Sequence, residues 1–237
     1  MSDYAVLDLF CGLGGFSQAF EESDRWHVTT VDIEARFDPD IRVDVLDLRP
    51  GDLPDPDVVL ASPPCTAFSM AASGTHLDGD GRPVSDWGRE SLALVHHTVG
   101  LIKGLDPDWW ILENPMGGMR KVLGRPDAHV WWCQYGADRA KPTDLWGRLP
   151  PSFEARRCWN ENPDCDHARA PRGADAGTQS SEKSAAERAM LPEELSASIL
   201  EAVENPEPVQ TKLVADGGEW NDCDGQADTD RNREAER

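Results

Sequence analysis

The chain has 237 residues, of which 39% are hydrophobic, and a formal net charge of −21 from 44 acidic and 23 basic side chains. This length suits one α/β domain with a buried core and a small insert. No apolar run is long enough to span a membrane, and polar first residues lead directly into a strand-like run, so we expect neither a membrane protein nor a signal peptide. The six unevenly spaced cysteines exclude a secreted disulfide framework and indicate the cytoplasm, that of the host cell if the protein is viral.

The acidic charge argues on its face against a nucleic-acid ligand, because polyanions repel one another. The acids are spread along the chain and lysine is scarce, however, which is typical of a protein that stays hydrated in high salt. We therefore interpret the charge as a sign of a halophilic host or its virus and not as a statement about the substrate. Since salt weakens phosphate contacts steeply, a DNA-binding protein in such a cell would depend on shape and base contacts.

The hydrophobic pattern alternates strands with helices. In chain order it predicts a strand at 4–10, a helix at 16–23, strands at 27–33, 42–48 and 56–64, a long helix at 88–105, strands at 107–115 and 129–136, and a helical region at 184–205. Such alternation predicts an α/β fold with a doubly wound, mostly parallel sheet that is covered on both faces. A ligand is then expected beyond the carboxyl ends of the strands.

A glycine turn follows the first strand, in the stretch DLFCGLGGFS at residues 8–17. Its glycines would allow a tight turn and a close approach to a ligand, but by itself an ordinary turn is about as plausible as a nucleotide site. Asp32 ends the second strand, where a carboxylate can bind ribose hydroxyls, and Asp44 could accept from an adenine amino group. No phosphate-binding lysine is present, so the set indicates an adenosyl ligand.

Cys65 stands in the stretch SPPCTAFS, directly after a strand and two prolines. A free cysteine is most often a small buried hydrophobe. Here Pro63 and Pro64 fix the backbone at the carboxyl edge of the sheet, which is where a nucleophile belongs in this architecture. Glu113 ends a later strand that we expect to neighbour the first. An acid at a strand end is usually only solvated, but in this crevice it could hold a proton for a ring nitrogen.

These motifs, in this order and spacing, resemble the cytosine-5 DNA methyltransferases. DLFCGLGGFS is similar to their cofactor motif, SPPCTAFS to their catalytic loop and ENP, at 113–115, to their Glu-Asn motif. The stretches CQYGADRAKPTDLWG, APRGADAGTQ and RAMLPEELSASI resemble the compact branch found in phages and prophages. The resemblance covers about residues 4–204 and implies a DNA modification enzyme that carries no nuclease in the same chain, with double-stranded DNA as its partner and no obligate protein partner.

A change in composition after residue 147, interpreted with the resemblance, predicts a division of the chain. Residues 1–147 would be the catalytic and cofactor-binding domain, and residues 148–180 a small, irregular target-recognition insert. Residues 181–204 would return to the catalytic domain as a helix. Residues 205–237 are polar and acidic without periodicity, and we expect a disordered tail.

The family chemistry assigns roles to individual residues. Cys65 would be the covalent nucleophile that adds to carbon 6 of cytosine, so that carbon 5 becomes able to accept the methyl group of S-adenosylmethionine. Glu113 would hydrogen-bond the ring at N3, Asn114 would position the loop, and the target base would leave the duplex. Lys141 completes the implied catalytic set. The implied cofactor-binding residues are Asp8, Phe10, Gly12, Gly14, Gly15, Asp32, Asp44 and Pro64.

The eighth motif departs from the family. Its usual Gln-x-Arg-x-Arg pattern corresponds to residues 139–143, Arg-Ala-Lys-Pro-Thr, which lack the second arginine. The insert is the most basic part of this acidic chain, and its arginines are expected to face phosphates and guanine edges, although a solvated loop is the alternative. The predicted DNA-contacting residues are Ser69, Arg139, Thr143, Arg156, Arg157, Arg169 and Arg172.

The insert also contains Cys158, Cys165 and His167, which could be three zinc ligands in a segment too polar to fold by core burial. Cys133 is a candidate for the fourth ligand, and free surface cysteines are the alternative. Other functions also stay open. They are the same chemistry on RNA, transfer from a modified donor, and a catalytically silent DNA- or cofactor-binding protein that blocks restriction.

Overall fold

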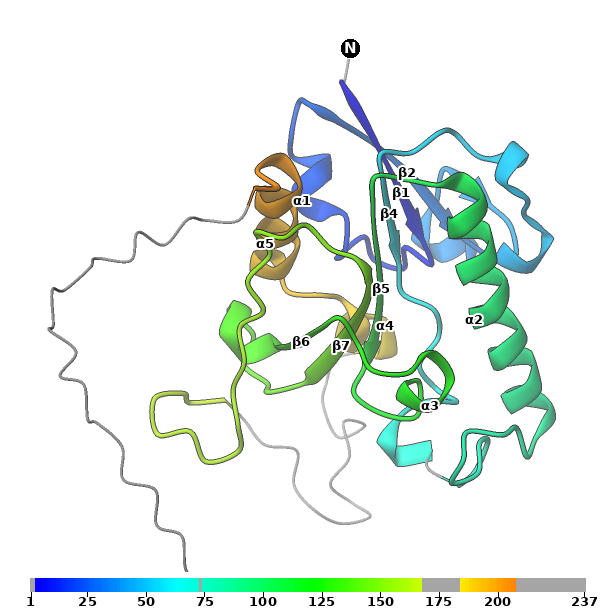
Figure 1. The fold of residues 1–237 in the computed structure, drawn as a ribbon, viewed down its shortest axis with the longest axis vertical. Coiled ribbons are helices and arrows are strands. Elements are labelled where there is room, and N and C mark those ends of the chain that lie inside the picture. Colours follow the sequence, from blue (N-terminus) through cyan, green and yellow to red (C-terminus); the bar gives the residue numbers. More distant parts are fainter. Residues whose placement is uncertain (1–2, 73, 168–183, 208–237) are drawn as a thin grey trace, which may run out of the picture.

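The computed structural model describes residues 3–72, 74–167 and 184–207. Its described strands form a seven-stranded sheet in the order β3-β2-β1-β4-β5-β7-β6 (Figure 1). The strands are β1 (Tyr4–Leu9), β2 (Trp26–Asp32), β3 (Ile41–Arg42), β4 (Val58–Ala61), β5 (Trp109–Pro115), β6 (Ala128–Trp131) and β7 (Pro142–Arg148). The first five strands are parallel, and β7 runs antiparallel to both of its neighbours. The predicted α/β class and mostly parallel sheet are confirmed.

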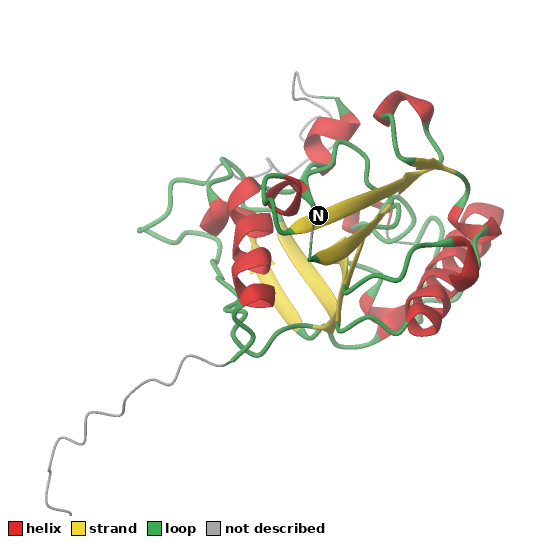
Figure 2. Ribbon diagram, turned by 90° about the horizontal axis from the view of Figure 1, so that it is seen from above, coloured by secondary structure: helices red, strands yellow, loops and turns green. Residues whose placement is uncertain are grey.

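Helices cover both faces of the sheet (Figure 2). They are α1 (Gln18–Glu21), α2 (Asp86–Leu105), α3 (Arg120–Leu123), α4 (Ala185–Ala189) and α5 (Glu193–Glu204). Alternate residues of the central strand β4 enter two separate core clusters, Val58 and Leu60 on the side of α5, and Val59 and Ala61 on the side of α2. All four are fully buried, because a parallel strand with helices on both faces is apolar throughout.

Two predicted strands are largely wrong. In residues 42–48, only Arg42 belongs to β3, and a 3-10 turn follows at Val45–Asp47. The amide of Leu46 in this turn donates to the Asp44 side chain. A carboxylate that caps a turn in this way competes with strand pairing. Residues 129–136 leave the sheet after Trp131 and form a 3-10 helix, η5, at Trp132–Tyr135, which ends at Gly136 with a φ of 80°. The helix predicted at 16–23 shortens to one turn, α1.

The strand order reverses between β1 and β4. From β1 the chain proceeds outward through β2 and β3, and it then crosses to the other side of β1 to form β4. The crevice outside the carboxyl ends of such a pair is where open α/β sheets bind ligands. The glycine turn follows β1 and the Cys65 loop follows β4, so both motifs lie at this edge.

Several predicted segments extend beyond the described residues. The insert is described as far as residue 167 and the tail as far as 207. Arg169, Arg172 and Cys223 lie outside the described part of the chain. Among the described residues, no helix has the length and apolar character needed to cross a membrane.

Candidate active site

The turn after β1 is conformationally strained. Phe10 has a φ of 63°, which is uncommon for a residue with a side chain, and Gly12 and Gly14 have φ values of 54° and 77°. The Asp32 carboxylate accepts from the amide of Gly12 at 3.0 Å and from the amide of Glu34 at 2.9 Å. Asp32 therefore ties the turn to the end of β2. Strain of this kind persists only where the surrounding structure imposes it, and it gathers at functional sites.

Asp8 lies fully buried beneath this turn. One of its carboxylate oxygens accepts from the hydroxyl of Ser17 at 2.7 Å, while the other, Oδ1, is buried and has no hydrogen-bond partner among the described residues. Burial raises the pKa of Asp8 to about 7. Carboxylates and backbone amides thus dominate the turn. The space beside Gly14 is open, since a Cβ there would meet no atom within 4 Å. The turn suits a ligand that carries amino groups and positive charge better than it suits a phosphate.

The Cys65 loop is held by backbone and side-chain contacts. The Cys65 carbonyl oxygen accepts from the amides of Phe68 and Ser69 at 3.0 and 2.9 Å. The buried Asn114 donates from Nδ2 to the carbonyl oxygen of Pro63 at 2.9 Å. Pro63 is itself buried, whereas Pro64 is exposed. The end of β5 therefore positions the loop, and the half-buried Cys65 thiol lies at the carboxyl edge of the sheet.

Glu113, Lys141 and Cys65 form an electrostatically coupled group. Burial raises the pKa of the Cys65 thiol, the charge of Glu113 raises it further, and the charge of Lys141 lowers it. Glu113 is 5% exposed, its Oε1 has no hydrogen-bond partner among the described residues, and burial raises its pKa to about 7. Burial lowers the pKa of Lys141 and the two neighbouring anions oppose that change. A thiol, a buried carboxyl group and an ammonium group thus lie in one site, where such perturbed groups are candidates for a function.

Lys141 is placed by the segment between η5 and β7. Its Nζ lies 3.3 Å from the centre of the Trp132 ring and donates to the carbonyl oxygen of Arg188 at 3.1 Å. Its φ of 22° is again in the left-handed region. Thr143 is buried, and its hydroxyl donates to the Lys141 carbonyl oxygen at 3.3 Å. Thr143 therefore helps to hold the backbone of Lys141 in place.

Sequence reasoning missed a buried ion-pair cluster on β7. The Asp144 carboxylate is fully buried and accepts from Nε and Nη2 of Arg120, both at 2.6 Å, and lies 2.7 Å from Nδ1 of His129. Trp131 donates from Nε1 to Nε2 of His129 at 3.1 Å. The signal was an acid inside the apolar stretch TDLW, where an unpaired charge would be costly.

The predicted DNA-contacting residues are not brought together. Arg157 lines a cavity of about 460 Å³ with Arg120 and Arg125, beside β6. Arg156 turns instead toward α5, with Nη1 3.3 Å from the Gln134 carbonyl oxygen and 3.8 Å from the Glu194 carboxylate. Ser69 and Arg139 are half-buried. The cavity therefore has a positively charged lining although the chain as a whole is strongly acidic.

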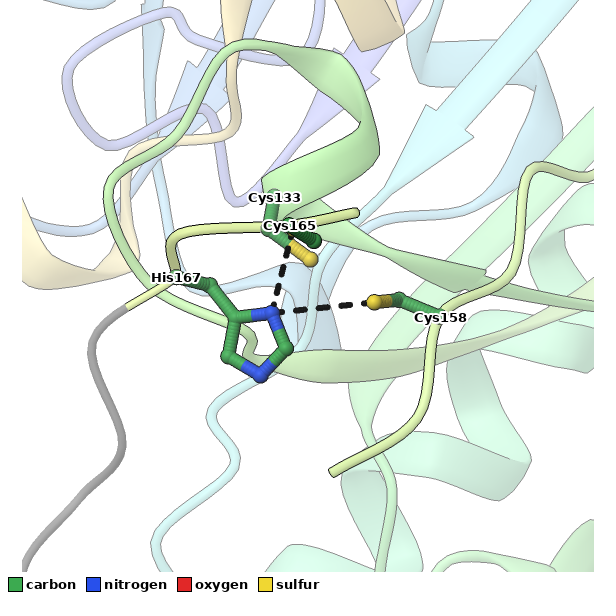
Figure 3. Close-up of side chains that lie close together, drawn as sticks. All are labelled: Cys133, Cys158, Cys165 and His167. Carbon is green, nitrogen blue, oxygen red and sulfur yellow. Dashed lines mark hydrogen bonds between the residues drawn. The ribbon is translucent and has the colours of Figure 1, made fainter. Parts of the chain in front are cut away.

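The predicted metal ligands do converge. The side chains of Cys133, Cys158, Cys165 and His167 point toward one another, and their ligand atoms all lie within 4.8 Å of one another (Figure 3). Cys133 belongs to η5, whereas the other three belong to the insert.

Comparison with known proteins places the chain in a family. Residues 4–122 match the C-5 cytosine-specific DNA methylase family. The chain is 32% identical over 191 residues to a protein of Frog virus 3 (isolate Goorha) named "Probable DNA (cytosine-5)-methyltransferase", with 73% of this chain and 86% of that protein covered. It is 35% identical over 122 residues to the type II methyltransferase M.HaeII of Haemophilus aegyptius, with 48% and 35% covered.

A solved structure from E. coli, described as a "DNA modification methyltransferase encoded within prophage", shares 20% identity at a TM-score of 0.43 and covers 65% of this chain and 51% of that chain. A likeness at that level supports no conclusion. The chain spans most of its viral relative but only 35% of M.HaeII. The family match and the viral relative confirm the resemblance that the motifs indicated. The chain belongs to the C-5 cytosine-specific DNA methylases, which are DNA (cytosine-5)-methyltransferases.

Proposed function

We propose that this protein transfers a methyl group from S-adenosylmethionine to carbon 5 of cytosine in double-stranded DNA, through a covalent bond between Cys65 and the target base. The observation that carries the proposal is the coupling of Cys65, Glu113 and Lys141 at the carboxyl edge of the sheet, next to the turn that follows β1. A DNA substrate would place the activity in the cytoplasm.

The residues around the glycine turn fit S-adenosylmethionine, which when bound supplies the methyl group. Its adenosyl part carries hydroxyl and amino donors, and its methionine part carries a sulfonium and an ammonium. The half-buried Asp44, at the carboxyl end of β3, and the Asp8 oxygen without a partner supply acceptors of the matching kind. Phe10, held at a φ of 63°, would present its ring to the adenine. We infer that Asp32 acts mainly by shaping the turn, because amides already occupy both of its oxygens.

The proposed chemistry begins with Cys65. Its thiolate forms a bond from Sγ to carbon 6 of a cytosine that has left the duplex, while protonated Glu113 gives its proton to N3. The ring is then electron-rich at carbon 5. Once carbon 5 carries the methyl group, a base removes its remaining proton, the bond from Sγ to carbon 6 breaks, and N3 returns its proton to Glu113. Lys141, which stands at the position of the family's first arginine, stabilises the thiolate.

The proposed roles agree with the positions of the acid and the nucleophile. Glu113, with a pKa of about 7, can hold or release its proton near neutral pH, which is what a proton donor to N3 requires. Asn114 keeps the Cys65 loop in place through the Pro63 carbonyl oxygen. Arg157, with the other arginines of the cavity beside β6, would contact phosphates.

The test is mass analysis of nucleosides from plasmid DNA after incubation with the protein and S-adenosylmethionine. We expect 5-methylcytosine with the unchanged protein and with Cys223→Ser, and none with Cys65→Ser. DNA that contains 5-fluorocytosine, which has no proton to lose from carbon 5, should remain covalently attached to the unchanged protein and to Cys223→Ser, but not to Cys65→Ser.

If the protein methylates added RNA but leaves DNA unmethylated, the proposed DNA substrate is wrong. Methylation that persists in Cys65→Ser would overturn the covalent mechanism. Binding of S-adenosylmethionine without transfer to either polymer would favour a silent binding protein.

A further inference from the structure

We propose that Cys133, Cys158, Cys165 and His167 bind one Zn²⁺ ion, which fastens the insert to the edge of the sheet at η5. We call these four residues the Cys3His cluster. Three thiolates and one imidazole are a ligand set of structural zinc sites, in which protein side chains fill all four positions. Cys133 comes from one segment and the other three from a segment that begins 25 positions later, so the ion would crosslink the two.

The distances fit a tetrahedral ion. Nδ1 of His167 lies 3.2 Å from Sγ of Cys165 and 3.6 Å from Sγ of Cys158 (Figure 3). With ordinary zinc–sulfur and zinc–nitrogen bond lengths, a tetrahedral centre separates a sulfur ligand from a nitrogen ligand by about 3.6 Å. All four ligand atoms lie within 4.8 Å of one another, so one ion can reach them with small side-chain adjustments.

The surroundings of the cluster suit thiolates. Asn162 donates from Nδ2 to Sγ of Cys158 at 3.2 Å, and Gln134 donates from Nε2 to Sγ of Cys165 at 3.5 Å. Donors of this kind around metal-bound sulfur orient the ligands and stabilise their negative charge. The ring of Trp131 lies 6.2 Å from the ring of His167, with the two planes tilted by 51°.

The insert needs a constraint of this kind. Its described residues, 149–167, form no helix or strand. Within 159–167 the backbone forms turns with short-range hydrogen bonds, for example from the amide of Cys165 to the Asn162 carbonyl oxygen at 3.3 Å. Leu149, Phe153 and Ala155 pack against the core, whereas the polar residues 160–167 have little apolar surface to bury. A metal supplies the missing free energy for segments of this kind.

The position of the cluster connects it with the active site. Cys133 follows Trp132, whose ring lies against Nζ of Lys141, and Cys158 follows Arg157 of the arginine-lined cavity. The ion would therefore fix the insert with Arg157 relative to Trp132, the residue whose ring contacts Lys141. This consequence for DNA modification rests on the proposed function, whereas zinc binding itself does not.

The first experiment is metal analysis of the full-length protein, purified in the absence of chelators. We expect one zinc per chain in the unchanged protein and in Cys223→Ser, and loss of the metal in Cys158→Ser and in His167→Ala. His167→Cys replaces the nitrogen ligand with a sulfur ligand and should retain zinc, which distinguishes loss of a ligand from loss of folding. Cobalt added to the metal-free protein should give the absorption of a tetrahedral thiolate site.

A second readout follows the insert itself. Trypsin can cut after Arg156 and Arg157, both exposed and directly before Cys158. Zinc removal should speed cleavage there by about tenfold or more, because a released segment opens locally. Cleavage after the exposed Arg25, between α1 and β2, should be unchanged.

The proposal is overturned if the reduced, unchanged protein contains no zinc and takes up no cobalt, or if zinc persists at full content in both Cys158→Ser and His167→Ala. A mass lower by two hydrogen atoms in the unreduced protein, without metal, would show a disulfide instead. Zinc bound by a protein that methylates nothing would refute the proposed function and leave the zinc site intact.

Discussion

At the scale of single residues, two charges act in opposite directions on one thiol. Glu113 raises the pKa of Cys65 and Lys141 lowers it, on top of an upward shift from burial. The raised pKa disfavours the thiolate, and a change in either neighbouring charge would tilt this balance. Protonation of Glu113 would do so, since it removes the negative charge that opposes the thiolate.

The two charges predict opposite effects on alkylation of Cys65. At about pH 8, Glu113→Gln should speed the reaction with iodoacetamide roughly 3–10-fold, and Lys141→Met should slow it by a similar factor. Both variants should lose methyl transfer, so the alkylation rate of Cys65 and the catalytic activity should change independently. Mass analysis of the Cys65 peptide measures the rate without interference from the other cysteines.

Glu90→Gln, which removes a charge from the exposed side of α2, is the matched control and should leave the rate unchanged. If Glu113→Gln and Lys141→Met shift the rate in the same direction, the charge balance described above is wrong.

At the scale of elements, the segment after β5 supports the Cys65 loop. The amide of Gly118 donates to the Phe68 carbonyl oxygen at 2.6 Å, and the amide of Met116 donates to the Pro142 carbonyl oxygen at 2.9 Å. A Cβ at Gly117 would lie 2.3 Å from the same Phe68 oxygen. The close approach of these loops requires glycine at 117, and any side chain there must push the Cys65 loop outward.

Gly117→Ala should therefore lower methyl transfer by about a hundredfold, because a displacement of roughly 1 Å at a reacting group can cost that much. The sheet should stay folded, as circular dichroism would show. The control is Gly100→Ala in the exposed middle of α2, where a Cβ would meet nothing within 4 Å.

Gly100→Ala should keep full activity and gain up to about 1 kcal/mol of stability from the better helix propensity of alanine. Full activity in Gly117→Ala would mean that the loop yields without moving Cys65, against the rigid support that the contacts indicate.

A second element-level contact joins α5 to the segment that follows the glycine turn. Ser196 of α5 donates from Oγ to the Phe16 carbonyl oxygen at 2.8 Å and accepts from the Ala19 amide at 3.1 Å. A Cβ at Gly15 would lie 2.7 Å from the Leu191 nitrogen. The last described helix therefore packs directly behind the glycine turn, and it helps to impose the strained conformation of that turn.

At the scale of the whole molecule, two buried acids oppose the stability of the fold at neutral pH. Asp8 and Glu113 both have pKa values raised to about 7 by burial. A raised pKa means that the folded state binds more protons than the unfolded state between about pH 4 and 7. The contribution of these two acids to stability is therefore greatest below that range and is lost as the pH rises through it.

Glu113→Gln should remove part of this dependence. The variant should match the unchanged protein near pH 4 and exceed its stability above about pH 8, by up to roughly 3 kcal/mol. Thermal unfolding across this range measures the effect, and Glu90→Gln should follow the unchanged protein throughout. A melting temperature of Glu113→Gln at or below that of the unchanged protein above about pH 8 would contradict the raised pKa.

The sequence by itself determined the class of fold, the family and the two loops that meet at the sheet edge. Strand and helix periodicity and the order of the motifs are local signals, and parallel strands bring Gly12, Cys65 and Glu113 to one edge. The halophilic origin, the disordered tail and the division into domains stay predictions. Local signals failed at residues 42–48, where a capping carboxylate replaced strand pairing.

Only the tertiary structure decided which distant side chains meet. Lys141 gains its place from Trp132 and the Arg188 carbonyl oxygen, Asp144 forms an ion pair with Arg120 and contacts His129, and Cys133 joins three ligands of the insert. Each of these contacts spans a loop whose path depends on packing against the sheet. Spacing along the chain carries no information about such a path, because the closing of a loop is set by the contacts at its ends.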